Sequence, residues 1–200
     1  MIYLIVKWLT KSGLNNIFAV FGFRVKSMDD PMIYIKKIEF LMNKLNVCIQ
    51  VFDAKKIADW EHLYFSAYHA LYAFKKGYNI SKKLNIEILL YAAATRQIKV
   101  AISRLGITEK TRNVACVIIS SNQPDGLAKT LDAKKEIVSI FNGIEDDRVL
   151  ALNSEKIMEL TSLYQISDQE LKLTSKITKD EKSAIKNCII EKIALLSLEI

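Results

Sequence analysis

The chain has 200 residues, which suffices for one domain with a sizeable core. Half of the residues are hydrophobic and only 2 are proline, a composition that excludes a largely disordered chain. The formal net charge of +7 permits binding to a polyanion without requiring it.

Cysteine usage and the start of the chain predict a soluble, cytoplasmic protein that does not bind a membrane. Cys48, Cys116 and Cys188 are far apart and lie in apolar runs, which favours buried thiols in a reducing compartment over a disulfide or metal cluster. The first residues lack a basic leader, and no uncharged stretch approaches the roughly 18 apolar residues of a membrane helix.

The first half of the chain predicts three strands and a helix. Residues 2–10 and 16–26 are rich in β-branched and aromatic residues and are separated by Ser12-Gly13, which is typical of a hairpin. Asp29-Asp30-Pro31 predicts the start of a helix, because apolar residues follow it at helical spacing. Residues 47–54 form the third expected strand.

The remainder is mostly helical. A helix over about 59–76 is closed by Gly77, another begins near Ser81, and residues 113–119 form a fourth strand. Further helices are expected at 127–141, 154–164 and about 180–198, with a short extended piece at 149–152. The order predicts a single α+β domain over residues 1–200, in which a small, largely antiparallel sheet of about four strands packs against several helices.

Enzyme signatures are nearly absent. The sequence has no glycine-rich phosphate loop, CxxC, HExxH or GxSxG motif. His62 and His69 lie two turns apart on one predicted helix, too far to share a metal, and we expect one surface and one half-buried histidine. We therefore expect no catalytic residue, no metal and no cofactor.

The segment 87–107, "EILLYAAATRQIKVAISRLGI", predicts a break in a helix. The apolar stripes of its two halves are rotated by roughly a third of a turn from one another, so one straight helix would expose one of them. A break near Ala94-Thr95 lets both stripes reach a core. Thr95 then becomes the N-cap of the second helix and places Arg96 and Gln97 in its first turn.

A first turn with an arginine favours an anionic ligand, because unpaired backbone N–H groups and a guanidinium both bind phosphate. Lys99 and Arg104 follow on the same segment, and Lys75, Lys76, Lys82 and Lys83 flank the Gly77 turn and add positive potential. The alternative is a solvated basic face on which Arg96 pairs with a carboxylate.

The terminal helix, residues 184–200, carries two apolar faces. Ile185, Cys188, Ile189, Ile193 and Leu196 form a broad face, and Ile190, Ala194 and Leu198 form a stripe on roughly the opposite side. The broad face can pack on the domain. The second stripe needs another surface, either a partner or another element of this chain.

The stretch "HALYAFKKGYNISKKLNIEILLYAAATRQIKVAISRLGI" (69–107), with "EKIALLSLEI" at the C-terminus, resembles the kinase-binding regulatory subunit of the KEOPS complex, in its archaeal type, whose eukaryotic relative is the PRPK-binding protein. The resemblance is good over about 50–107, fair over 113–152 and clear over 184–198. Relatives often have a glycine where this sequence has Ala94-Thr95.

The resemblance implies a non-catalytic subunit for tRNA threonylcarbamoyladenosine modification. It implies direct binding and stimulation of a small atypical kinase that works as an ATPase, indirect association with the threonylcarbamoyl transferase and dimerisation subunits, and capture of the 3′ CCA end of tRNA. The implied tRNA-binding residues are Thr95, Arg96, Gln97, Lys99, Arg104 and the four lysines at 75, 76, 82 and 83. The implied kinase contacts are Ile190, Ile193, Ala194 and Leu198.

Two other functions fit the residues. One is a pure protein-interaction scaffold whose basic face is merely solvated. The other is a small-molecule enzyme or anionic-ligand sensor with its pocket at 95–97, which the absence of a nucleophile–base pair disfavours.

Overall fold

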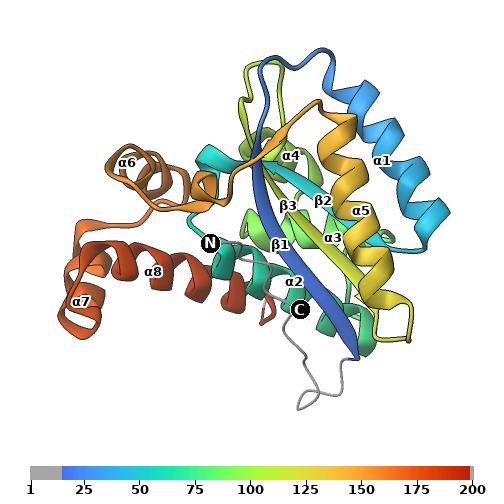
Figure 1. Ribbon diagram of the computed structural model, residues 1–200. Coiled ribbons are helices and arrows are strands. Elements are labelled where there is room, and N and C mark those ends of the chain that lie inside the picture. The colour runs from blue at the N-terminus through green and yellow to red at the C-terminus, as the bar shows by residue number, and fades with distance from the viewer. Residues whose placement is uncertain (1–14, 199–200) are drawn as a thin grey trace. The chain divides into compact units, whose positions relative to one another are not determined.

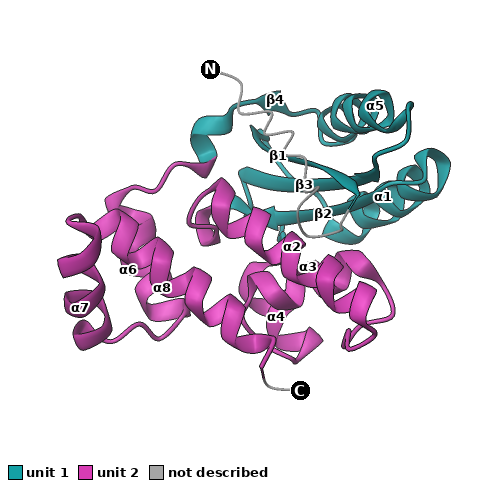
Figure 2. Cartoon of the chain, turned by 90° about the horizontal axis from the view of Figure 1, so that it is seen from below, with its two compact units in different colours: residues 1–54, 107–149 teal, residues 55–106, 150–200 magenta. Residues whose placement is uncertain are grey.

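The computed structural model describes residues 15–198, and its contacts group the chain into two units. Unit 1 comprises residues 1–54 and 107–149, and unit 2 comprises residues 55–106 and 150–200, so each unit is built from two separate segments (Figure 2). The single domain expected over 1–200 stays a prediction. The expected strand at 2–10, and with it the hairpin, lies outside the described residues.

The sheet belongs to unit 1 and confirms the predicted α+β class. Its strands are β1 (Asn16–Arg24), β2 (Cys48–Asp53), β3 (Asn113–Ser121) and β4 (Ile144–Glu145), in the order β2-β3-β1-β4. All pairs are antiparallel, and β1 pairs with β3 along its whole length. The two-residue β4 was not predicted, and the piece expected to be extended at 149–152 instead begins in a 3₁₀ turn, Asp147–Leu150.

Helices α1 (Pro31–Leu45) and α5 (Gly126–Ile140) lie side by side over one face of this sheet (Figure 1). Asp30 caps α1 by accepting the N–H of Met32 at 2.9 Å, as the sequence predicts. The core between helices and sheet is formed by alternate residues of the strands, which include Phe21, Phe23, Ile49, Val51 and Ile118, together with Ile38, Leu41, Ile137 and Phe141. The two helices therefore cover the apolar side chains on this face of the sheet.

Unit 2 is helical. Its helices are α2 (Trp60–Lys76), α3 (Leu84–Ala92), α4 (Ile98–Leu105), α6 (Ser154–Leu163), α7 (Asp168–Thr178) and α8 (Glu181–Leu196), and a 3₁₀ turn at Ala54–Lys56 precedes them. α8 packs against α2, α3, α6 and α7. Helix α7 was not predicted, although Ser167 and Glu170 form a reciprocal capping box at its start.

All three cysteines were expected to be buried thiols, and two of them are buried. Cys116 and Cys188 are buried, Cys48 is partly buried, and none is in a disulfide. Among residues 15–198, no helix has the length and apolar character needed to cross a membrane.

Candidate functional site

The predicted break in segment 87–107 is confirmed. α3 ends at Ala92, α4 begins at Ile98, and Ala94 between them adopts a left-handed backbone with φ 45°. A residue with a Cβ rarely takes this conformation, so the surrounding contacts hold the turn in place.

The predicted capping role of Thr95 is wrong. Gln97 is the N-cap residue of α4, and its side chain makes no capping hydrogen bond. The Thr95 hydroxyl accepts the N–H of Gln97 at 3.3 Å, which stabilises the connecting turn instead of the helix. Arg96 and Gln97 therefore precede α4 and do not lie in its first turn.

Arg96, Gln97 and Lys99 are exposed on this turn. The Arg96 side chain forms no hydrogen bond or ion pair with any residue of the described range 15–198. The alternative prediction, in which Arg96 pairs with a carboxylate, is therefore wrong for these residues. The turn thus presents an arginine whose hydrogen-bond donors are available to a ligand.

Buried hydrogen bonds hold the end of α3 in place. The Ala92 carbonyl accepts the Tyr164 hydroxyl at 2.6 Å and the His62 ring nitrogen Nε2 at 3.0 Å. The Nδ1 atom of the same ring accepts the N–H of Ala58, which assigns the proton to Nε2. His62 is fully buried, which corrects the expectation of one surface and one half-buried histidine, and burial lowers its pKa to about 4. This histidine is a structural group.

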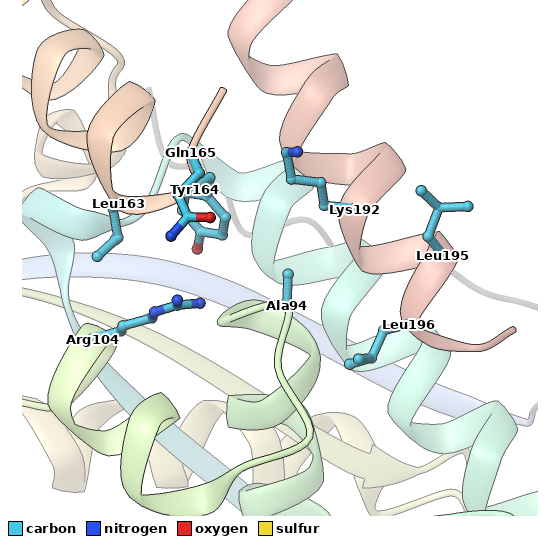
Figure 3. A pocket seen from close by; sticks show the side chains of 8 residues that line it. All are labelled: Ala94, Arg104, Leu163, Tyr164, Gln165, Lys192, Leu195 and Leu196. Atoms are coloured by element: carbon cyan, nitrogen blue, oxygen red, sulfur yellow. The ribbon is translucent and has the colours of Figure 1, made fainter. Parts of the chain in front are cut away.

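A pocket of about 280 Å³ lies beside the turn (Figure 3). It is lined by Ala94, by Arg104 of α4, by Leu163, Tyr164 and Gln165 at the end of α6, and by Lys192, Leu195 and Leu196 of α8. The Arg104 guanidinium extends toward Ala94 and donates to the Ala93 carbonyl at 3.2 Å. Lys192 pairs with Glu170 at 3.1 Å.

Two cationic side chains from different helices therefore line one pocket. Sequence reasoning found Arg104 and missed Lys192 and Gln165. Lys192 stands out in the sequence as a charged residue within the mainly apolar run "CIIEKIALL". This run carries no information about how far Lys192 lies from Arg104.

The four predicted lysines lie at the other end of α3. Lys75 and Lys76 end α2, Lys82 and Lys83 precede α3, and all four are exposed. α3 has nine residues and is about 13 Å long at 1.5 Å per residue, with Lys82 and Lys83 before its start and Arg96 after its end. An extended ligand could contact both ends, whereas a single small anion could not.

A buried carboxylate organises this lysine-bearing turn. Glu87 of α3 is 1% exposed and accepts the N–H of Ser81 at 2.7 Å and that of Ile80 at 3.1 Å. These charge-assisted hydrogen bonds fix the chain just before Lys82 and Lys83. The backbone of the turn that carries Lys82 and Lys83 is therefore held in one conformation.

Helix α8 has the two faces that its sequence predicts. Ile185, Cys188, Ile189, Ile193 and Leu196 are buried in unit 2. Ile190 and Ala194 are half-buried on the other stripe, Leu198 is 77% exposed, and Leu195, which was not singled out, is 48% exposed. Ile193 was expected to contact a partner, yet it is 0% exposed and belongs to the buried face.

Within the described part of the chain, no three His, Cys, Asp or Glu side chains are grouped so that they could hold a metal ion. No match to a curated protein was found. Residues 34–197 match the family described as kinase binding protein CGI-121, and the chain therefore belongs to this family.

Proposed function

We propose that this member of the kinase-binding CGI-121 family is a non-catalytic subunit of the KEOPS complex, in which it binds and stimulates a small atypical kinase and recruits tRNA through its 3′ CCA end. Family membership supports the kinase partner directly. The role in tRNA threonylcarbamoyladenosine formation, and the indirect association with the transferase and dimerisation subunits, follow from the resemblance over 69–107 and at the C-terminus.

One observation carries the tRNA proposal. The turn between α3 and α4 is held rigid from beneath by the hydrogen bonds to Ala92, while Arg96 on its surface has no partner among residues 15–198. The backbone that carries Arg96 is fixed, and its guanidinium has no internal partner to give up when it binds a phosphate bidentately. The 3′ end of tRNA is single-stranded, so its phosphates and unstacked bases can reach such a turn.

The lysines beyond the other end of α3 support an extended ligand. A strand that places its terminal nucleotides at Arg96, Gln97 and Lys99 would run over the surface above α3, whose residues 87–92 are buried, toward the second basic group. That group would meet the phosphates of the acceptor stem, which contribute affinity without sequence preference.

The charge-reversing change Arg96→Glu tests this function. We expect tRNA binding to weaken at least tenfold, because a carboxylate that repels phosphates replaces a guanidinium that binds them, and hydrogen bonds to charged groups are worth about 1.5–3 kcal/mol. Filter binding with intact tRNA and with tRNA trimmed of its CCA end measures the effect, and the variant should no longer distinguish the two.

Lys110→Glu is the matched control, since it makes the same charge change on an exposed residue of unit 1. It should bind both tRNAs like the unaltered protein. Unchanged affinity of Arg96→Glu for intact tRNA, with kinase binding also intact, would contradict 3′-end recruitment and leave the scaffold function.

A second candidate function rests on the pocket lined by Arg104 and Lys192, which could hold a small anion. Isothermal titration with inorganic phosphate and with ATP separates the candidates. Small-anion binding that survives Arg96→Glu and is lost in Arg104→Gln would favour a ligand-binding protein over a tRNA-recruiting one.

A further inference from the structure

A groove of about 380 Å³ lies on unit 1 and is independent of the proposed tRNA and kinase surfaces, all of which lie in unit 2. It is lined by Lys36, Lys37, Phe40 and Leu41 of α1 and by Glu136 and Ile140 of α5. The Phe40 side chain is 72% exposed. The core face of α1 is supplied by Ile38 and Leu41, so unit 1 itself gives Phe40 little burial.

The exposed face of α1 has one apolar line with cations on both sides. Ile33 and Phe40 are seven residues apart and therefore share a face of the helix, and Ile33 is 46% exposed. Lys36 and Lys37 lie between them and form no hydrogen bond or ion pair with any residue from 15 to 198. A partner that covers the Phe40 ring removes apolar surface from water, which stabilises the complex.

The carboxylate in the groove is already neutralised. Glu136 pairs with Lys44 of α1 at 2.9 Å, which leaves Lys36 and Lys37 as the uncompensated charges at the rim. The groove thus combines an exposed aromatic ring with net positive charge, and its electrostatic complement is an acidic ligand that also carries apolar surface.

We propose that this groove between α1 and α5 docks an acidic, amphipathic segment of a partner protein, which inserts a bulky apolar side chain against Phe40 and places carboxylates at Lys36 and Lys37. Glu136 and Ile140 wall one side of the groove, which suits an inserted side chain better than the flat surface of a bilayer. A phosphate backbone would leave the Phe40 ring uncovered, whereas an amphipathic segment brings an apolar side chain to cover it.

Peptide display against the full-length protein tests the proposal, with a random 16-residue library as the probe. Sequences enriched on the unaltered chain, and not on Phe40→Ala, should be net acidic and carry aromatic or large aliphatic residues at helical spacing. Fluorescence anisotropy of the best peptide should show at least tenfold weaker binding to Phe40→Ala and to Lys36→Glu/Lys37→Glu.

Lys26→Glu/Lys110→Glu is the matched control, because it makes the same charge change at exposed residues of unit 1 outside the groove. It should bind the peptide within about twofold of the unaltered chain. The proposal is overturned if enriched peptides lack net negative charge or bind Phe40→Ala equally well. It is also overturned if vesicles containing anionic lipid, or polyuridylate, bind in a Phe40-dependent way while no acidic peptide does.

Discussion

The candidate site depends on a few residues whose roles are set by their surroundings. Ala92 accepts two buried hydrogen bonds and Ala94 takes a left-handed backbone, and together they turn the chain so that Arg96 faces solvent. The break could be predicted because the two apolar stripes do not align on one helix. The presence of Arg104 and Lys192 in one pocket could not be predicted. The two residues are 88 positions apart in the sequence, and no local pattern shows that they line the same pocket.

His62 makes the stability of unit 2 depend on pH. Its pKa is about 4 in the folded protein and about 6.5 in an unfolded chain, so the unfolded chain binds more protons in the range between these values. Stability from this residue is fully present above pH 6.5 and is lost as the pH falls toward 4, by roughly 3 kcal/mol at 1.36 kcal/mol per pKa unit.

Urea unfolding of the full-length chain at pH 7 and pH 4.5 measures this loss. His62→Gln should lower stability at pH 7, because it disturbs the bonds to Ala58 and Ala92, but it should flatten the pH dependence. The same steep loss between pH 6.5 and 4.5 in His62→Gln would assign the effect to other groups.

At the scale of elements, Asp30 with Pro31 predicted the start of α1, and Gly77 predicted the end of α2. Asp30 with Pro31 begins α1, Asp59 caps α2, and Gly77 ends it with φ 78°. Helix α7 was missed because none of its residues is buried, so its sequence shows no apolar stripe at helical spacing. The capping box at its start was the only local signal for a helix. The apolar run at 149–152 predicted an extended piece because short apolar runs fit a strand as well as a tight turn.

Substitutions in and just after helix α8 can test the proposed partner contact separately from a core contact. Leu198→Glu changes an exposed residue, so we expect loss of co-purification with the kinase subunit and a melting temperature that stays within about 1 °C. Ile193→Glu buries a charge without a partner, and we expect several kcal/mol of destabilisation whether or not the kinase is present.

Co-expression pull-down and thermal melting of each purified variant check both outcomes. Leu127→Glu, on an exposed leucine of α5, is the matched control and should retain the kinase. Full kinase binding by Leu198→Glu, together with Ile190→Glu, would show that the partner does not use this stripe of α8.

At the scale of the whole molecule, composition and strand order sufficed for the α+β class and the antiparallel sheet. They did not reveal the division into two units, because the boundaries at 54/55, 106/107 and 149/150 carry no change in composition. The positive charge of the chain also says little by itself, since its basic residues are spread over both units and include Lys36 and Lys37 in unit 1 as well as those around α3 in unit 2.

The salt dependence of tRNA binding distinguishes the two basic groups at the ends of α3. Replacing Lys75, Lys76, Lys82 and Lys83 with glutamine should reduce the slope of log K against log salt by about 3–4, at roughly 0.9 per lost contact with a duplex phosphate. The preference for an intact CCA end should remain, because Arg96 is unchanged.

Filter binding at several salt concentrations measures the slope. Glutamine at Lys26, Lys36, Lys37 and Lys110, which are exposed in unit 1, provides the charge-matched control and should leave the slope as it was. An equal reduction in both variants would show that overall charge attracts the tRNA without a defined path along α3.

The interleaving of the two units also sets an order of events on the ribosome. Every segment of unit 1 has been made once residue 149 is added, but unit 2 lacks α8 until about 50 residues later. Translation at roughly 5–20 residues per second makes that interval about 3–10 s. During it α2 and α3 are without α8, which packs against both, so the part of their apolar surface that α8 covers stays exposed until α8 is synthesised.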